Sequence, residues 1–465
     1  MGHGVVWAID VLSRETMLFA AVGFAIGGLD DLAIDLIYLV RRLCHLVTGR
    51  GGMPLVADFE GKASGHIAVF VAAWDESAVI GAMLRAALAR FDHPYYTIYV
   101  GTYPNDRPTI DAVADVAETD SRIRLVIGSE NGPTTKAGCL NAIWRAMLCD
   151  EAAGAPIAKA VVLHDAEDIV HPAELVIFDR LIDRHWVVQL PVLPLIDRRA
   201  RLVSGHYADE FAESHAKQMV VREFLGAGLP LAGVGCAIAR PALDLIASAR
   251  DGEPFDPTSL TEDYELGLGI DALGGGAAFA RVAERRGGPV VAVRAYFPPT
   301  LAAAVRQKSR WMIGIALAGW DRVGWGKLSD WREHWMRMRD RRGPLAVLVL
   351  GIAYVALVAW AASWLLHLVM PGPTPVIAPA MRVLLEINAV LLGWRFLLRI
   401  GFTTGAYGWR EACWVLPRML VANLVALLAA RRALTRYWTM LRGGEVQWDK
   451  TRHDFPNDIA AALDR

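Results

Sequence analysis

Two groups of carboxylates carry the chemistry that this sequence suggests first. In one of them, Asp165, Glu167 and Asp168 follow directly after the apolar run Ala158–His164. Acids two positions apart at the end of a strand can reach one hard cation from the same side, and Mg²⁺ or Mn²⁺ held in this way takes phosphate oxygens as further ligands. The same acids could form a solvated turn that caps the next helix. For this group taken alone, the two interpretations are about equally good.

The second group is Thr261-Glu262-Asp263, which precedes the helical pattern YELGLGIDALG. Thr261 suits a helix N-cap, and acids in a first helical turn interact favourably with the helix dipole. For this group by itself, the structural interpretation outweighs a catalytic one.

A third group, Gln307, Arg310 and Trp311, is spaced three and four residues apart, so its members share one face of a helix. Arg310 can bind a phosphate through two parallel hydrogen bonds, and Trp311 can stack on a sugar ring. The alternative is an amphipathic helix at a membrane surface, with basic side chains that reach the headgroups and a tryptophan at the interface.

The segment that must position these groups, roughly residues 55–320, alternates apolar runs with amphipathic stretches. Such alternation predicts a mostly parallel sheet covered by helices on both faces. Ligands of these sheets bind beyond the carboxyl ends of the strands, where the acids above fall. The expected strands are His66–Ala73, Tyr96–Tyr103, Arg122–Ile127, Ala158–His164 and Trp186–Val192, and the expected helices are Glu76–Ala89, Pro108–Glu118, Lys136–Leu148 and Pro172–Asp183.

Hydrophobic residues make up 54% of the 465 residues, and the mean hydropathy is +0.31, which favours membrane segments. Three spans are expected, at Thr16–Val40, at 345–370 and at 383–402. The run 345–370 has no charged residue and is long enough to cross a hydrocarbon core of ~30 Å. The chain is therefore expected to divide into a membrane helix in residues 1–50, a catalytic domain with an interfacial helix in 51–325, and further membrane helices in 326–465.

Arginine pairs give the orientation, because cytoplasmic flanks carry excess Lys and Arg. Arg41-Arg42 and Arg341-Arg342 place the middle domain in the cytoplasm. A fourth span would put a group of arginines outside, so residues 412–440 are expected to form an interfacial or re-entrant helix, followed by a cytoplasmic tail. The amino terminus has no basic region and no cleavage site typical of a signal peptide.

Charged residues inside the first and third expected spans suggest that these spans pack together. Asp31 and Asp35 share a helix face, and so do Arg395 and Arg399. Isolated charges near the bilayer centre cost ~2.5–3.5 kcal/mol each, so they usually find partners. We expect the pairs Asp31–Arg395 and Asp35–Arg399, with interfacial snorkelling of each residue as the alternative.

Composition excludes other classes. The net charge of −1 gives no basic field for nucleic acid. The five cysteines are scattered without a CxxC pair, which argues against a zinc ribbon or a disulfide framework and fits a reduced compartment.

The three groups, in this order and spacing, resemble the signature of family 2 glycosyltransferases of the membrane-integrated, cellulose-synthase-like kind, over about residues 65–320. Two positions depart from the family pattern: Asp75 stands where Asn is usual, and Glu167 where a second Asp is commoner. Further segments that match the family are Val71–Glu76, Gly101–Asp106, Lys136–Asn141 and Gly233–Cys236.

The resemblance implies an α/β fold of the GT-A type, Rossmann-like with a mostly parallel sheet, joined to transmembrane helices. It implies inversion at the anomeric carbon, with Asp263 as general base beside Glu262. Mg²⁺ or Mn²⁺ would be held by Asp165 and Glu167, with Asp168 as an outer partner. Arg310 would stabilise the leaving diphosphate, while Gln307 and Trp311 would bound the acceptor site. The implied nucleotide-binding residues are Ala72, Trp74, Glu76, Asp106, Lys136 and Asp165.

A narrower resemblance, to the glycosyltransferase portion of NfrB-type phage-adsorption proteins, rests on residues 28–32, on HDAEDIVHP and on residues 448–456. Members of that group are bacterial inner-membrane proteins tied to surface polysaccharide production, and longer members carry a carboxy-terminal cyclic di-GMP domain. That domain is expected to be absent here, and no PilZ-type element is visible.

This resemblance implies transfer of a hexosyl or N-acetylhexosaminyl unit from a UDP-sugar to a growing polysaccharide. The implied partners are membrane lipids and an export protein of the periplasm or outer membrane. Transfer to a polyprenyl phosphate and an inactive scaffold or phage-receptor component are the alternatives. A transporter would need more spans.

Overall fold

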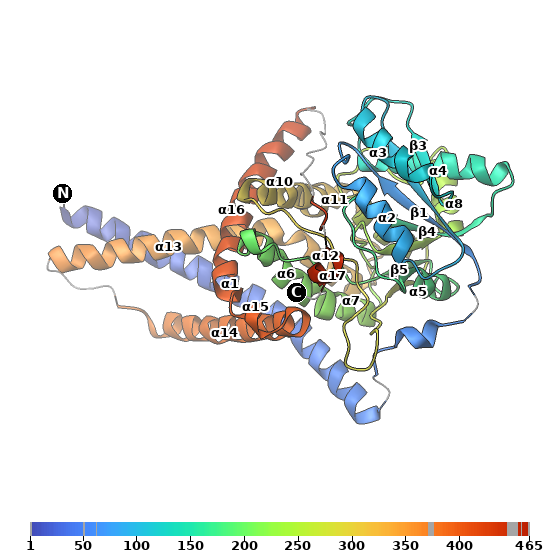
Figure 1. Ribbon diagram of the computed structural model, residues 1–465. Helices are drawn as coiled ribbons and strands as arrows, with labels where there is room; N and C mark the ends of the chain where they lie inside the picture. The colour runs from blue at the N-terminus through green and yellow to red at the C-terminus, as the bar shows by residue number, and fades with distance from the viewer. Residues whose placement is uncertain are drawn as a thin grey trace.

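The computed structural model describes residues 2–49, 52–61, 63–370, 376–443, 454–456 and 458–463. A seven-stranded sheet with helices on both faces forms one part, and three long helices extend from it to one side (Figure 1). This arrangement confirms the predicted α/β class. Residues 448–453 of the NfrB-type resemblance lie outside the described part of the chain.

The sheet has the order β3-β2-β1-β4-β6-β5-β7. Four strands lie where apolar runs predicted them, and the fifth predicted strand is shorter than expected: β1 (His66–Ala72), β2 (Tyr96–Thr102), β3 (Ile123–Ile127), β4 (Ala158–His164) and β5 (Val187–Gln189). Two strands were not predicted, β6 (Cys236–Ala239) and β7 (Ala277–Phe279). Only β6 runs antiparallel to its neighbours, β4 and β5, so the sheet is mostly parallel as expected.

The helices around the sheet follow the predicted alternation. Nearly every side chain of β1 is buried, as a central strand covered on both faces requires. Four helices match the four predicted ones to within a few residues: α2 (Ile80–Arg90), α3 (Arg107–Ala117), α4 (Lys136–Ala152) and α5 (Glu174–Leu181). Further helices of the described chain are α7 (Met219–Leu225), α8 (Arg240–Ser248), α9 (Glu262–Ala272) and α17 (Ile459–Leu463).

Two longer helical stretches contain a π-helical turn. One is α6 (Val203–Glu213), which continues through Ser214–Gln218 into α7. The other is α10 (Leu301–Trp311), which continues through Met312–Ala318 into α11 (Gly319–Val323). Such turns often occur at functional sites, and the second follows Trp311 directly.

In the described part of the chain, two helices are long and apolar enough to cross a membrane: α1 (Gly2–Thr48), from Gly4 onward, and α13 (Gly343–Val369). The third predicted span lies within α14 (Pro379–Tyr407), and its crossing stays a prediction. The predicted interfacial helix lies within α15 (Trp409–Ala412) and α16 (Val415–Leu441), and α16 crosses between the long helices and the sheet (Figure 1). α12 (Trp331–Arg341) leads into α13.

The three long helices alternate in direction, as successive membrane spans would, and the orientation that the arginine pairs indicate stays a prediction. Asp10 near the start of α1 contacts His367 near the end of α13, so these two helices are antiparallel. Asn388 of α14 donates to the carbonyl of Ala21, and Arg395, about two turns later, reaches Asp31, so α14 runs parallel to α1.

One of the two predicted charge pairs is confirmed. Arg395 lies 2.8 Å from Asp31. The pair Asp35–Arg399 is wrong, because the helix formed by α6 and its π turn supplies nearer partners: Lys217 lies 2.5 Å from Asp35, and Arg399 lies 2.9 Å from Glu213. These partners are far away in sequence, so helix spacing alone could not identify them.

Candidate functional site

The acids after β4 belong to a loop that a buried charge network holds in place. Oδ2 of Asp168 accepts hydrogen bonds from the backbone N–H of Asp165 (3.0 Å) and from Nδ1 of His164 (2.8 Å). Nε2 of His164 lies 2.6 Å from Glu174. Burial alone would lower the pKa of His164, but the two carboxylates outweigh it and raise this pKa to about 10. The imidazole is therefore charged and donates from both nitrogens, which fixes the loop.

Lys136 connects the two acidic groups. It is the first residue of α4, behind the N-cap Thr135, whose side chain accepts from the backbone of Gly138. Its ammonium lies 2.5 Å from Oδ1 of Asp165 and 3.3 Å from the carbonyl of Gly233. Burial opposes its charge, but Asp165, Glu262 and Asp263 together raise the pKa of Lys136. The lysine therefore stays protonated between the two groups.

The carboxyl group of Asp263 has a pKa raised into the neutral range. Burial is the main cause that raises its pKa, to about 7, and the neighbouring Glu262 adds to this rise, while Lys136 and the backbone N–H of Tyr264 oppose it. That N–H donates to Oδ1 of Asp263 over 2.8 Å. A general base is most effective when its pKa lies near the working pH.

The purely structural interpretation of Thr261 is wrong in part. Thr261 occupies the N-cap position of α9, but its side chain makes no capping hydrogen bond. Instead it packs against the π turn after α10, where a Cβ built on Gly314 would lie 2.4 Å from its hydroxyl oxygen. Thr261 therefore sets how closely α9 approaches the helix that carries Arg310.

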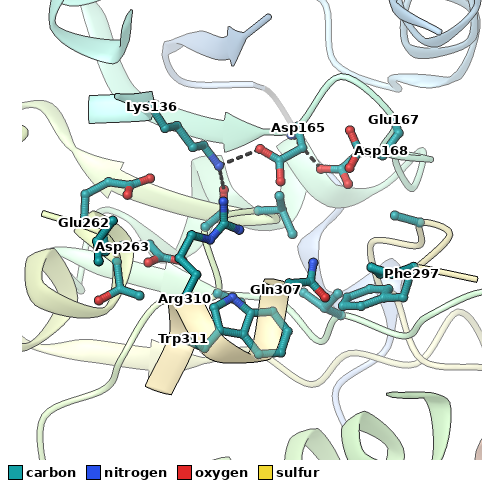
Figure 2. Close-up of a pocket in the computed structure, with 18 of the residues that line it drawn as sticks. Lys136, Asp165, Glu167, Asp168, Glu262, Asp263, Phe297, Gln307, Arg310 and Trp311 are labelled. Carbon is teal, nitrogen blue, oxygen red and sulfur yellow. Dashed lines mark hydrogen bonds and ion pairs between the residues drawn. The ribbon is translucent and has the colours of Figure 1, made fainter. Parts of the chain in front are cut away.

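Gln307, Arg310 and Trp311 lie toward the acids, as their shared helix face predicted (Figure 2). Within the described part of the chain, Nε of Arg310 and Oε1 of Gln307 are buried without a hydrogen-bond partner. Lys308 points elsewhere and pairs with Glu210 of α6. The alternative of a headgroup-seeking amphipathic helix is therefore wrong for Arg310, which faces the protein interior.

All three groups line a single pocket (Figure 2). Aromatic residues that sequence reasoning missed, Phe211 and Phe297, line it too. No motif singles out Phe211, whereas Phe297 directly precedes Pro298-Pro299 at the entrance to α10. The predicted site residues that line the pocket are Lys136, Asp165, Glu167, Asp168, Glu262, Asp263, Gln307, Arg310 and Trp311.

The remaining predicted nucleotide-binding residues lie at the carboxyl ends of β1 and β2, on the same edge of the sheet but outside this pocket: Ala72 ends β1, Trp74 and Glu76 follow it, and Asp106 follows β2. Oδ2 of Asp106 accepts from the backbone N–H of Asp75 over 2.5 Å, so Asp106 holds the loop after β1.

Asp75, which stands where the family has Asn, has a φ of 54°. Asn and Asp both adopt this left-handed conformation more readily than other residues with a side chain, so the exchange preserves the backbone of the loop.

A divalent ion fits the two acids after β4. Asp165 and Glu167 both line the pocket and offer the carboxylate oxygens that Mg²⁺ and Mn²⁺ prefer. Among the described residues, no group of three or more His, Cys, Asp or Glu side chains could hold an ion. An ion here would take its other ligands from water and from the substrate, which is usual for Mg²⁺ beside a phosphate.

Comparison with known proteins agrees with this geometry. Residues 64–314 match the family model described as glycosyltransferase like family 2. The chain is 33% identical, over 97% of its length, to bacteriophage adsorption protein B of Escherichia coli K12 and to bacteriophage N4 adsorption protein B of Escherichia coli O157:H7. It spans 64% of the length of each of these relatives.

Among solved structures, the chain is similar to the mannosyltransferase PcManGT from Pyrobaculum calidifontis in complex with GDP-mannose and Mn²⁺. The TM-score is 0.53 at 17% identity, over 88% of this chain and 98% of that one. This likeness concerns the fold, including the helices beyond the sheet.

Proposed function

The chain belongs to glycosyltransferase family 2, and on that premise we propose that it transfers a sugar, with inversion, from a nucleotide-diphosphate sugar to a growing surface polysaccharide. The proposed donor is a UDP-sugar carrying a hexosyl or N-acetylhexosaminyl unit. The proposed place is the cytoplasmic face of a bacterial inner membrane, which the chain crosses several times.

The observation that carries this proposal is the position of Arg310. Its guanidinium lies in the pocket opposite the acids after β4, and its buried Nε has no partner among the described residues. A buried N–H without a partner is unfavourable, because it has lost its water without gaining a compensating hydrogen bond, and here it belongs to a guanidinium that lines the pocket. An anionic ligand such as a diphosphate would supply that bond, and it would lie within reach of Asp165 and Lys136.

The pocket residues then divide into two roles. Asp263 takes the proton of the acceptor hydroxyl while that oxygen attacks the anomeric carbon from the side opposite the diphosphate, which inverts this carbon in one displacement. Arg310 and Lys136 stabilise the negative charge that develops on the departing diphosphate. Trp311 and Phe297 offer flat apolar faces to the acceptor sugar, and Gln307 offers a polar group beside them.

Asp165 and Glu167 are the proposed ligands of a divalent ion, which would neutralise charge on the diphosphate when bound. The solved mannosyltransferase of the same fold binds GDP-mannose together with Mn²⁺, which supports this class of ion. His164 and Asp168 would keep the loop of these two acids in place.

Membrane attachment supports a polymer or lipid-linked acceptor over a soluble one. Two helices can cross a membrane by length and composition, and α16 contacts both α10, which carries Arg310, and α13. One face of α16 carries an apolar stripe of exposed side chains. They recur every three to four residues, apart from one longer interval. They are Leu416, Leu420, Leu424, Leu434, Trp438 and Leu441. Such a stripe suits a helix lying in the headgroup region.

The experiment that tests this proposal is a donor screen with the full-length protein in lipid nanodiscs. Release of nucleoside diphosphate would be measured for UDP- and GDP-sugars, with and without Mn²⁺ and with membrane extract as acceptor source. We expect metal-dependent release with at least one UDP-sugar, and loss of Mn²⁺-dependent UDP binding in Asp165→Ala. Asp271→Asn changes an acid of α9 that lines no part of the pocket and is the control. No release with any donor, together with no nucleotide binding, would favour a scaffold role.

A further inference from the structure

Helix α12 contacts a membrane helix and the helix of the catalytic acids at the same time. Toward the membrane helix α1, Arg339 pairs with Asp30, and its Nη2 lies 3.0 Å from Asp31. Trp335 of α12 donates from Nε1 to Asp30 over 2.6 Å. Most of this contact is buried, since the side chains of Arg339, Asp30 and Asp31 are each less than one-fifth exposed.

Two further arginines form ion pairs with the same acids. Arg342, just after α12, lies 2.5 Å from both Asp30 and Asp31, and Arg395 of α14 lies 2.8 Å from Asp31. The paired acids of the Gly28–Leu32 segment therefore tie the helices α1, α12, α13 and α14 together. Buried ion pairs of this kind fix relative position more than they add stability, because desolvation offsets much of the attraction.

On its other side, α12 reaches the residue next to the catalytic base. Oδ2 of Asp340, the neighbour of Arg339, accepts from the hydroxyl of Tyr264 over 3.0 Å. Asp340 also meets Nη1 of Arg222 through both of its oxygens, at 2.8 and 2.9 Å. Tyr264 is only 4% exposed, so its hydroxyl needs this acceptor.

Tyr264 is therefore held at both ends. Its hydroxyl is fixed by Asp340, and its backbone N–H donates to Oδ1 of Asp263 over 2.8 Å. A hydrogen bond from a fixed donor limits the rotation of the carboxylate and favours its ionised form. The orientation of the Asp263 carboxylate matters, because a small misplacement of a reacting group can slow an enzyme strongly.

We propose that Tyr264 and Asp340 are positioning residues for Asp263, and that the Asp30–Asp31 pair of the membrane helix α1 holds α12 where Asp340 can do this. The inference rests on the proposed function, because it takes Asp263 as the base. In this proposal, Asp30 and Asp31 of α1 position the base indirectly, in addition to packing the helices together.

The central test is Tyr264→Phe in the full-length protein. The variant loses one hydroxyl, and Asp340 keeps its pair with Arg222, so we expect it to fold. The expected result is a fall in kcat of about tenfold, by analogy with other small misplacements, with the donor Kd from calorimetry unchanged.

The pH profile gives a readout that a purely structural role would not move. The charged groups that face Asp263 are Glu262, Lys136 and Arg310, and none of them is altered. A looser Tyr264 N–H stabilises the carboxylate less, so the acidic limb of kcat should move to higher pH, by about half a unit. Tyr354→Phe is the control, because it removes a hydroxyl that joins α13 to Asn423 of α16 and lines no part of the pocket.

Asp340→Asn and Arg339→Gln extend the test along the chain of contacts. Both should show the same lower kcat, the same unchanged donor Kd and the same shift of the acidic limb.

Near wild-type kcat and pH profile in Tyr264→Phe, with an inactive Asp263→Asn, would overturn this inference and leave the proposed function standing. An active Asp263→Asn would instead refute the base assignment itself. A general loss of donor affinity and thermal stability in all three variants would reduce α12 to a packing element and would also overturn the inference.

Discussion

The ammonium of Lys136 lies 2.5 Å from Oδ1 of Asp165, and the same lysine lowers the pKa of the buried Asp263. One cation at the start of α4 therefore serves both acidic groups of the pocket. Its position joins two clusters that are nearly a hundred residues apart in the sequence and that line one pocket.

Replacement of this lysine should affect binding and proton transfer together. In Lys136→Met, loss of a charge-assisted contact worth about 1.5–3 kcal/mol should weaken nucleotide binding by about ten- to a hundredfold. Because Lys136 lowers the pKa of Asp263, its removal raises that pKa, so the base becomes protonated at a higher pH and the acidic limb of kcat moves upward. Lys327→Met changes an exposed lysine and should leave both the nucleotide affinity and the acidic limb of kcat unchanged. An unaltered nucleotide affinity would refute the role of Lys136.

Gly233 should tolerate no side chain, because a Cβ there would lie 2.6 Å from Oδ2 of Asp263. Gly226 gives a matched control, since it has a similar positive φ, 70° against 76°, but open space around its Cβ position. Both alanine variants should lose about 1 kcal/mol of stability from backbone strain. Only Gly233→Ala should lose most of its activity at normal protein content. Equal activity in the two variants would show that the loop before β6 does not border the reacting groups.

Arg310→Lys keeps the charge but loses the planar fork that binds two phosphate oxygens. We expect kcat to fall by about a hundredfold, the effect typical of removing one oxyanion-stabilising donor. Arg306→Lys is a suitable comparison on the same helix, because Arg306 does not line the pocket. If the two variants had similar rates in the diphosphate-release assay, the guanidinium of Arg310 would have no special role.

Cysteine labelling can decide whether α14 crosses the membrane. Val376 precedes α14 and is 88% exposed, and the exposed Cys413 follows it. In intact spheroplasts, a membrane-impermeant maleimide should label Val376→Cys but reach Cys413 only after lysis. The other cysteines are first replaced by serine or alanine. Labelling of both positions from the same side would rule out the third span.

The strands β1 to β4 could be predicted because each is a nearly continuous apolar run of five to seven residues. In contrast, β6 has four residues and β7 has three, and both are held by partners distant in the sequence, which local pattern cannot reveal. The first predicted span, Thr16–Val40, was shorter than α1, because charged residues, Arg14-Glu15 and Arg41-Arg42, flank it and hydropathy alone does not follow a helix past them. The acids inside this helix are stabilised by ion pairs with arginines and a lysine that are distant in the sequence.

The pocket residues were predictable to the extent that motifs carry them. Asp263 and Arg310 stand in short motifs whose order along the chain is specific, and the structure brings them to one pocket. The contact of Asp340 with Tyr264 joins residues 76 positions apart and has no local signal. The contact between Glu174 and His164 also has no local signal, because it depends on where α5 packs against the sheet.

The central claim is that Asp263 is the base of an inverting sugar transfer, and turnover of Asp263→Asn tests it most directly. The amide has nearly the shape of the carboxylate but cannot accept the proton, so kcat should fall by roughly a hundredfold or more. The measurement is nucleoside diphosphate release with the donor found in the screen, alongside calorimetric donor binding. The account predicts lost turnover with donor affinity retained. Turnover close to that of the wild-type chain would contradict it.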